Sequence, residues 1–352
     1  MPLPPLFGHE GVKDRLAGAS ASGRLPQALL FEGPRGVGKQ RLALWLAQLL
    51  ECETPAAKGR EPCGQCRSCR LVLSLQHPDV HWLVPLEPSK RAADADKQVD
   101  LVAEALAAEM AERSAQPLYG PTSGLAAHGI AAVRLVLRRL ALTPALGRRK
   151  VFVVGDAERL IAQQGADAAA NALLKALEEP PADSVFILTA AEPDALLPTI
   201  RSRVVRVRVA RLSDSAVTAF AQQVLGITAK GELAQGISTA EGCPGRLLAP
   251  QGESGGGGGA PEQAARFLEA SGKGAAARHA QALGQMPFQA RGAFTAMLDA
   301  LAGRLRTEAR GGGETRKLVE AIARVMDARE LAQGNVNPQL LSAVLAEDLA
   351  EA

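Results

Sequence analysis

The sequence has 352 residues, of which 47% are hydrophobic and 22% charged, and its formal net charge at pH 7 is +3. This length and balance predict two or three globular domains and exclude wholesale disorder. Aromatic residues make up only 3% of the chain, which argues against a platform of stacked rings for single-stranded nucleic acid. The small net charge does not predict nucleic-acid binding by the whole chain, so only a local basic patch would provide it.

The chain lacks a run of about 18 consecutive apolar residues, so we expect no transmembrane helix and no membrane partner. The segment from Met1 to Gly8 lacks the basic-then-apolar order of a signal peptide. We therefore expect a cytoplasmic protein. In a reducing compartment, clustered cysteines favour a metal site over disulfides.

Strands and helices alternate through the first part of the chain. Apolar runs predict strands over residues 26–32, 81–86, 151–154, 185–189 and 204–209. Helical spacing predicts helices over residues 40–50, 99–113, 130–142 and 171–178. The last strand alternates apolar residues with Arg206 and Arg208, which is typical of a sheet edge. The alternation predicts an α/β fold, a parallel sheet with helices on both faces.

The composition changes at several points and suggests domain boundaries. We expect an α/β domain over 1–210, a small helical domain over 211–250, a Gly-rich linker over 251–261 and a helical bundle over 262–352. Within the first domain, residues 52–79 should form a loop-rich insert. Residues 87–128 are best interpreted as a surface insertion of unassigned role.

A phosphate-binding loop is predicted between the first strand and the first of these helices. The residues Gly33-Pro34-Arg35-Gly36-Val37-Gly38-Lys39 match G-x-x-x-x-G-K in the required strand–loop–helix context. Gly33, Gly36 and Gly38 let backbone N–H groups converge on phosphate oxygens. Lys39 and the helix N-terminus add positive charge. The site should therefore accept ATP or ADP.

Two departures predict that the chain turns over ATP poorly or not at all. The position after Lys39 is Gln40 rather than the Ser or Thr whose hydroxyl ligates Mg²⁺, so Mg²⁺ binding is doubtful. In hydrolysing relatives the strand that ends here carries an Asp, which holds the metal, followed by a Glu, which polarises the attacking water. In this sequence Asp156 is followed by Ala157, and Glu158 comes one place late. In an extended backbone Glu158 would point to the opposite face.

Four of the five cysteines cluster in the insert. Cys63, Cys66 and Cys69 follow the spacing C-x-x-C-x-x-C, and Cys52 precedes them. Four thiolates suit tetrahedral Zn²⁺ and leave no open coordination position, so a structural zinc site is predicted. The remaining Cys243 is interpreted as a simple small residue.

The order of these motifs resembles the AAA+ clamp-loader family of the bacterial DNA polymerase III. Besides the phosphate loop, the resemblance is carried by His77-Pro78-Asp79 after the cysteines, by the stretch Asn171–Pro181 (NALLKALEEPP) and by Ile200-Arg201-Ser202-Arg203. It covers most of residues 6–250. It implies a P-loop AAA+ domain, a lid domain over 211–250 and a collar domain for oligomerisation over 262–352.

Within the family, the chain resembles the delta-prime type more than the tau/gamma motor type, which shares the zinc insert and the Asn171-type stretch. Three features favour the delta-prime type. Gln40 and Ala157 replace residues that ATP hydrolysis requires, and His77-Pro78-Asp79 follows the cysteines. The chain also ends soon after its helical bundle. This type implies tau/gamma and delta subunits as partners. The sliding clamp and primed DNA would be reached through the assembly.

The resemblance also implies roles for single residues. Arg203, in the Ser-Arg motif, is the candidate arginine finger that enters a neighbouring subunit's ATP site. Val204 replaces the family's usual third residue, Cys, and leaves the assignment of Arg203 intact because that cysteine has no charge role. Thr189 resembles the first sensor of the terminal phosphate, and Arg246 after Gly245 resembles the second, although an ordinary strand-end Thr and a solvent-facing Arg are comparable interpretations.

Other charged residues are given less specific interpretations. Arg206 and Arg208 are expected to form a solvated basic edge, and Arg134 and Arg138 are candidates for DNA contact within the assembly. An acid/base role for Glu178 and its neighbour Glu179 is rejected, since the pair ends a helix before a double proline. The resemblance gives that stretch a structural and interface role.

Three hypotheses follow. The first is a non-hydrolysing clamp-loader subunit that helps to load the clamp and supplies Arg203 in trans. The second is an active motor ATPase of the tau/gamma type, in which Gln40 and Glu158 replace the usual groups. The third is an unrelated zinc-dependent DNA-binding module, which the phosphate-loop core and the scarcity of aromatic residues oppose.

Overall fold

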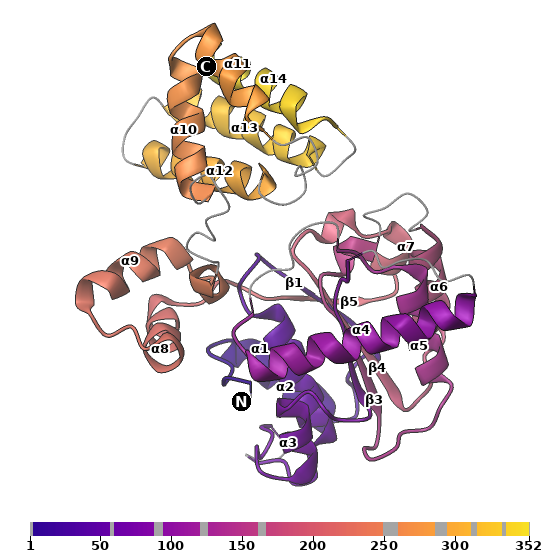
Figure 1. The fold of residues 1–352 in the computed structure, drawn as a ribbon. Helices are drawn as coiled ribbons and strands as arrows, with labels where there is room; N and C mark the ends of the chain where they lie inside the picture. The colour runs from indigo at the N-terminus through magenta and orange to yellow at the C-terminus, as the bar shows by residue number, and fades with distance from the viewer. Residues whose placement is uncertain are drawn as a thin grey trace. The chain divides into compact units, whose positions relative to one another are not determined.

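The computed structural model describes residues 3–56, 60–87, 94–119, 126–160, 167–248, 260–285, 294–310, 315–332 and 336–351. These residues form two compact units, one up to residue 248 and one from residue 260 onward, each with its own hydrophobic core (Figure 1). Among the described residues, no helix combines the length and apolar character needed to cross a bilayer.

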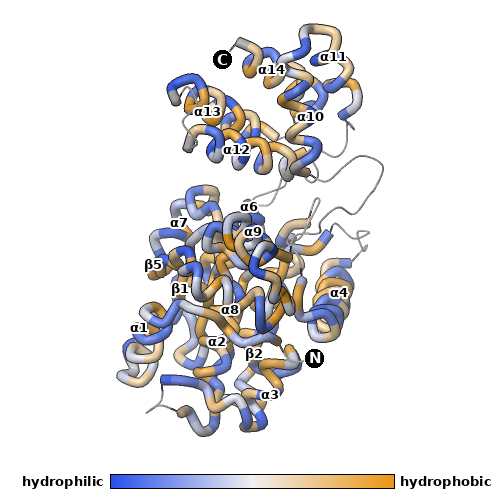
Figure 2. The backbone as a smooth tube through the Cα atoms, turned by 90° about the vertical axis from the view of Figure 1, so that its left-hand side faces the viewer, coloured by the Kyte–Doolittle hydropathy of each residue, from blue (hydrophilic) through white to orange (hydrophobic). Residues whose placement is uncertain are grey.

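A five-stranded parallel sheet forms the centre of the first unit, with strand order β2-β3-β4-β1-β5. The strands are β1 Ala28–Glu32, β2 Val80–Leu83, β3 Lys150–Val154, β4 Ser184–Ala190 and β5 Val205–Arg208. All five predicted strands are therefore confirmed, with ends shifted by a few residues. Figure 2 shows hydrophobic residues on α2 and the strands near it, and also on the helices of the second unit.

The burial of each strand follows its position in the sheet. Every residue of β3 and β4 is buried, as expected for central parallel strands that are covered on both faces. β5 pairs with β1 alone and exposes Val205, Arg206 and Arg208. The predicted edge strand is therefore confirmed.

Helices cover both faces of the sheet, as predicted. On one face α2 packs against β1, β3 and β4, and it also contacts α1 and α3. On the other face each of α4, α5 and α6 contacts the helix that follows it, up to α7. The helices up to the last strand are α1 Glu10–Ala21, α2 Lys39–Glu51, α3 Arg67–Leu73, α4 Ala95–Ala115, α5 Ile130–Leu140, α6 Asp167–Glu178 and α7 Pro198–Arg201.

Several elements differ from the sequence prediction. The helices α1 and α7 were not predicted, and the insert expected to be loop-rich contains α3, whose N-terminus is capped by the Cys66 side chain. The helix predicted from residue 171 begins at Asp167. The predicted linker 251–261 lies outside the described residues except at its end, where the helix α10 already begins at Ala260.

The small helical region, residues 212–248, is here called the lid. It consists of α8 Asp214–Leu225, α9 Lys230–Ala240 and a 3₁₀ turn at Pro244–Leu248. Ser213 caps α8 by accepting a hydrogen bond from the Ala216 amide, and Gly226, with a left-handed φ of 70°, ends it. Phe7 packs edge-on against Phe220, with ring centroids 5.6 Å apart, and so fastens the N-terminal segment to the lid.

The second unit is entirely helical where it is described, which confirms the predicted bundle. Its helices are α10 Ala260–Gly272, α11 Ala275–Leu283, α12 Thr295–Arg310, α13 Thr315–Leu331 and α14 Pro338–Glu351. Phe267, Phe294 and Leu298 are fully buried and form the centre of its core.

Candidate functional site

The phosphate loop, residues 33–39, joins the buried strand β1 to the buried helix α2. Gly36 and Gly38 have left-handed φ values of 77° and 100°. At Gly33 an added Cβ would lie 2.2 Å from the carbonyl oxygen of Val209. Side chains are therefore excluded at these positions, which gives the loop its tight curvature.

Lys39 lies inside the curve of the phosphate loop. Its Nζ donates hydrogen bonds to the carbonyl oxygens of Gly33 at 2.8 Å and Pro34 at 3.0 Å. The residue is 5% exposed. Burial lowers the pKa of Lys39, and the charges of Glu158 and then Asp156 oppose that shift. The ammonium group thus contacts the loop carbonyls and is influenced by the charges of two acidic side chains.

The lid touches the phosphate loop through backbone atoms. The amide of Gly245 donates a hydrogen bond to the carbonyl oxygen of Gly36 at 2.8 Å. A Cβ added to Gly245 would lie 2.7 Å from the Gly36 Cα. The predicted second sensor, Arg246, follows in a 3₁₀ turn and pairs with Glu241 at 2.6 Å. The Arg246 hydrogen bond lowers the pKa of Glu241.

Gln40 fills space between α2 and the end of β3. A Cβ on Gly155 would lie 3.0 Å from both the amide carbon and the Nε2 of Gln40. The Gln40 Oε1 is buried and has no hydrogen-bond partner among the described residues. An unsatisfied buried oxygen beside a phosphate loop is suited to a ligand that completes its hydrogen bonds.

Thr189, the predicted first sensor, is fully buried at the end of β4. Its Oγ1 accepts a hydrogen bond from the Asp156 amide at 3.1 Å. This contact holds Asp156 where β3 ends, with a left-handed φ of 48°. The structure therefore brings Thr189 and Asp156 together at the carboxyl edge of the sheet, where parallel α/β folds bind ligands.

The assumption of an extended backbone at Glu158 is wrong. The left-handed Asp156 turns the chain, and a 3₁₀ turn follows at Ala157–Leu160. Glu158 is only 9% exposed, and its Oε1 accepts a hydrogen bond from the Ala191 amide at 3.1 Å. Burial, with the charge of Asp156, raises the pKa of Glu158. The turn thus brings Glu158 back toward the phosphate loop.

The phosphate loop offers groups that fit a nucleotide phosphate. The glycine-rich backbone and Lys39 suit phosphate oxygens. The buried Gln40 Oε1 and Glu158 Oε2 lack partners among the described residues, and as acceptors they would pair with a hydrogen-bond donor or a cation and not with a phosphate oxygen. The hydroxyl that normally ligates Mg²⁺ is missing, because Gln40 holds its position. Bound ATP would supply a transferable phosphoryl group, and Lys39 would hold its outer phosphates.

Arg203 lies in the turn that follows α7. Its Nη2 forms an ion pair with the Oε1 of Glu178 at 2.6 Å, and its Nη1 donates to the carbonyl oxygen of Thr199 at 2.9 Å. The side chain is 34% exposed. The nearby Arg201 and Arg206 pair with Asp194 and Glu32 respectively.

The four predicted cysteine ligands converge at one point. The Sγ atoms of Cys52, Cys63, Cys66 and Cys69 all lie within 4.8 Å of one another, and those of Cys63 and Cys69 are 3.9 Å apart. Zinc–sulfur bonds of about 2.3 Å in a tetrahedron place sulfurs about 3.8 Å apart. The cluster therefore fits a zinc ion. Cys243 is buried away from this set, as expected of a small packing residue.

Backbone amides donate hydrogen bonds to sulfur atoms of this cluster, and the pKa shifts of its thiols differ in direction. The amides of Cys63 and Cys66 donate to the Sγ atoms of Cys52 and Cys63, both at 3.3 Å. A Thr54 hydrogen bond, followed by backbone hydrogen bonds, lowers the pKa of Cys63 to about 6, whereas burial raises that of Cys69. Bound zinc would keep all four ligands deprotonated.

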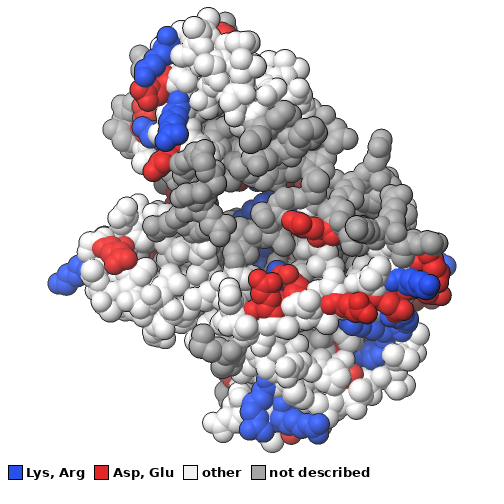
Figure 3. All heavy atoms as spheres, in the orientation of Figure 1, with Lys and Arg blue, Asp and Glu red and all other residues white. Residues whose placement is uncertain are grey.

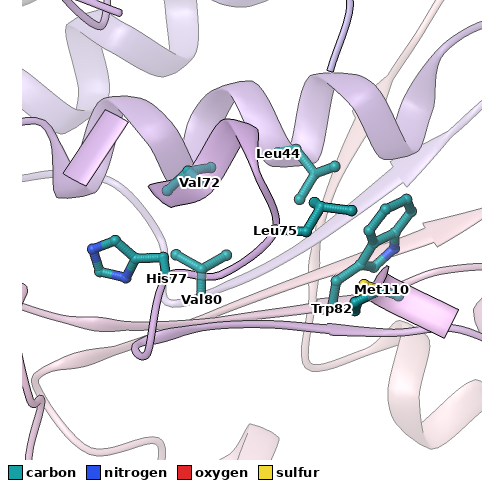
Figure 4. Close-up of a pocket in the computed structure, with 7 residues that line it drawn as sticks. All are labelled: Leu44, Val72, Leu75, His77, Val80, Trp82 and Met110. Atoms are coloured by element: carbon teal, nitrogen blue, oxygen red, sulfur yellow. The ribbon is translucent and has the colours of Figure 1, made fainter. Parts of the chain in front are cut away.

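The insert is attached to the rest of the unit by Glu61. One carboxylate oxygen pairs with Lys13 at 2.8 Å, and the other accepts a hydrogen bond from the Trp45 indole at 3.1 Å. Beneath the insert, a small cavity is lined mostly by apolar side chains (Figure 4). It has room for about one water molecule, so it is too small for a substrate.

The motif His77-Pro78-Asp79 has a structural role. The buried Asp79 carboxylate accepts hydrogen bonds from the amides of Ala145 at 2.6 Å and of Leu146 and Gly147, both at 2.7 Å. Burial by itself raises the pKa of Asp79, because it disfavours the charged form. The three backbone hydrogen bonds nevertheless hold the pKa of Asp79 below its usual range. The motif therefore fixes the loop between α5 and β3.

The insertion at 94–119 packs beside the basic helix α5. Acidic side chains of α4 are exposed, among them Asp96, Asp100, Glu104 and Glu112, and red and blue groups lie together there in Figure 3. Arg138 pairs with Asp100 at 2.9 Å, whereas Arg134 is exposed. The acidic residues of the insertion thus partly neutralise the basic face of α5, which the sequence analysis named as a candidate for DNA contact.

Two residues of the site were missed by sequence reasoning. Glu178 was given no link to Arg203, and Gly245 was noted only as the neighbour of Arg246. Both act through contacts with residues distant in sequence, so no local pattern reveals them. The glycine before Arg246 was the available signal for a close backbone approach.

Comparisons with known proteins agree with these motifs. The DNA polymerase III subunit delta' of Escherichia coli is 35% identical over 190 residues, which is 54% of this chain and 44% of that protein. The corresponding protein of Pseudomonas aeruginosa is 37% identical over 180 residues, 51% of this chain and 42% of that protein. The chain thus matches less than half the length of these relatives.

A gamma/tau relative and a solved structure are also similar. The DNA polymerase III subunit gamma/tau of Mycobacterium tuberculosis H37Rv is 34% identical over 199 residues, 56% of this chain and 27% of that protein. The crystal structure of a gamma subunit-related protein from Thermotoga maritima covers 96% of this chain and 99% of its own. Its TM-score of 0.46 and 18% identity are too low to support an argument.

The family described as DNA polymerase III, delta subunit matches residues 8–213. This match spans the sheet, the phosphate loop, the cysteine insert and Arg203. Because it covers more than half of the 352 residues, the chain belongs to the DNA polymerase III delta subunit family.

Proposed function

We propose that this chain is a non-hydrolysing subunit of the bacterial DNA polymerase III clamp loader, of the delta-prime type. It would help to load the sliding clamp onto primed DNA together with tau/gamma and delta subunits, in the cytoplasm. Family membership and the similarity to delta' and gamma/tau proteins support this proposal. The lid would close over the phosphate loop, and the helical second unit would serve as the collar.

The observation that carries the proposal is the placement of Arg203. Its guanidinium is held at the surface by Glu178, not in the chain's own phosphate loop, where Lys39 already supplies a positive charge. An arginine supplied in trans neutralises charge on a phosphoryl group as it transfers. Arg203 would therefore act on ATP bound by a neighbouring subunit.

ATP turnover by the reconstituted loader tests this role. Arg203→Ala should lower DNA-stimulated turnover without preventing assembly, since arginine fingers are worth roughly a thousandfold or more at the site they serve. Arg203→Lys should recover only part of it, because lysine lacks the planar fork of donors. Unchanged turnover with Arg203→Ala would show that the finger assignment is wrong.

A second candidate, an active motor ATPase, is favoured by the return of Glu158 toward the phosphate loop. There it stands near Lys39 and Asp156, and its Oε2 has no partner among the described residues. This candidate predicts ATP turnover by the chain alone, lost with Lys39→Ala and with Glu158→Gln. The first proposal predicts no turnover by the chain alone.

A further inference from the structure

Two motifs that are distant in sequence meet at Arg203. Glu178 is the last residue of α6, at the end of the stretch Asn171–Pro181, and Arg203 follows α7. The Oε1 of Glu178 and the Nη2 of Arg203 are 2.6 Å apart. The two proline residues that stop α6 leave Glu178 at the helix end, facing this turn.

The guanidinium of Arg203 is held by more than the ion pair. Its Nη1 donates to the carbonyl oxygen of Thr199 at 2.9 Å and to the Oγ of Ser202 at 3.2 Å. Three acceptors therefore fix a planar group with a rigid set of donors. About a third of the arginine side chain still faces solvent, with 34% exposure.

We infer that Glu178 is a positioning residue for the arginine finger, holding the Arg203 guanidinium at the surface in the orientation that meets a partner's ATP. This inference rests on the proposed function of Arg203. An arginine that is already held loses less rotamer freedom when it engages a phosphate. Glu178 itself does not touch the reacting atoms.

Glu178 orients Arg203 without trapping it. The Glu178 side chain is 44% exposed, and solvent and salt weaken ion pairs at such positions. The ion pair therefore restricts the Arg203 side chain, but an N–H donor of Arg203 can leave Glu178 at a small cost in free energy when a phosphate approaches. Removing the carboxylate should therefore slow the neighbour's reaction.

The next residue provides a matched control. Glu179 is also exposed and directly follows α6, and it makes no side-chain ion pair or hydrogen bond within the part of the chain that the structure describes. Glu179→Gln removes the same charge as Glu178→Gln, one residue away. Any difference between the two variants therefore reports the contact with Arg203.

Steady-state ATP turnover by the complete loader with primed DNA and clamp tests the inference. Glu178→Gln should lower kcat about two- to fivefold, the range expected for one exposed ion pair, and leave the KM for ATP unchanged. Glu178→Asp should restore part of kcat, and Glu179→Gln should match the wild type. Turnover with Glu178→Gln that equals or exceeds the wild type would overturn the positioning role.

A double-mutant cycle separates this inference from the proposed function. If Glu178 acts through Arg203, Glu178→Gln should cause no further loss in a chain that already carries Arg203→Ala. Additive losses would show that Glu178 acts elsewhere. If Arg203→Ala itself has no effect, the proposed function fails instead. Size-exclusion chromatography of each assembled variant confirms that the complexes are intact.

Discussion

The amide of Gly245 donates a hydrogen bond to the carbonyl oxygen of Gly36 at 2.8 Å, so backbone atoms of the lid and of the phosphate loop are in direct contact. A Cβ on Gly245 would lie 2.7 Å from the Gly36 Cα and 3.0 Å from its oxygen. Backbone atoms cannot rotate away as a flexible side chain does. The contact therefore requires glycine on the lid side and ties lid position to loop shape.

Gly245→Ala should separate the lid from the phosphate loop. The added methyl group would force a backbone shift, with an expected loss of about 1–3 kcal/mol in the free energy of unfolding, as for overpacked sites. Urea unfolding followed by circular dichroism measures it. Gly231→Ala is the control, because nothing lies within 4 Å of an added Cβ in that helix. Equal effects of the two substitutions would contradict the contact.

Zinc removal should unfold the cysteine insert and loosen its attachment through Glu61. Chelation should lower the melting temperature, and Cys69→Ser should leave clearly less than one zinc per chain by metal analysis. Cys243→Ala is the matched control, since this buried cysteine lies outside the cluster. Loss of zinc with Cys243→Ala, or full zinc content with Cys69→Ser, would disprove the ligand set.

Asp79→Asn should destabilise the first unit by about 2–3 kcal/mol at pH 7, because an amide cannot accept all three backbone hydrogen bonds. Folding lowers the pKa of Asp79 from its ordinary 3.8. The carboxylate therefore stabilises the fold above that value, and this contribution is lost as the pH falls through the folded pKa. The difference in free energy of unfolding between the wild type and Asp79→Asn should thus become smaller as the pH falls toward 3.

The unfolding free energies of Asp79→Asn and wild type at several pH values check this dependence. Asp14→Asn, on the exposed side of α1, is the control and should change the free energy of unfolding little at any pH. A loss for Asp79→Asn that stayed constant down to pH 3 would contradict the proposed role of the carboxylate.

Features with a local signature were predictable from the sequence. The cysteine spacing and the glycine pattern fix ligand and loop geometry within a few residues, and the apolar runs gave all five strands. The helix α1 was missed because its apolar face is short: only Leu16 and Ala17 are buried. A weak periodicity of this kind does not distinguish a helix from a loop.

Features that depend on tertiary contacts were not predictable. The Glu178–Arg203 pair and the Gly245–Gly36 contact join residues from separate elements, so their geometry follows from the folded sheet and lid. The prediction of an extended backbone at Glu158 was wrong for a different reason. The left-handed Asp156, held by Thr189 across two strands, turns a backbone that the apolar run suggested would continue straight.

The most direct test of the central claim compares ATP turnover by the chain alone with turnover by the reconstituted loader containing clamp and primed DNA. Wild type, Arg203→Ala and Arg201→Ala chains are measured in both states; Arg201 pairs with Asp194 and serves as the control. The account predicts that none of the three chains hydrolyses ATP alone. It also predicts that Arg203→Ala markedly lowers ATP turnover by the loader, whereas Arg201→Ala does not. Turnover by the isolated chain that Lys39→Ala abolishes, or a loader indifferent to Arg203→Ala, would contradict it.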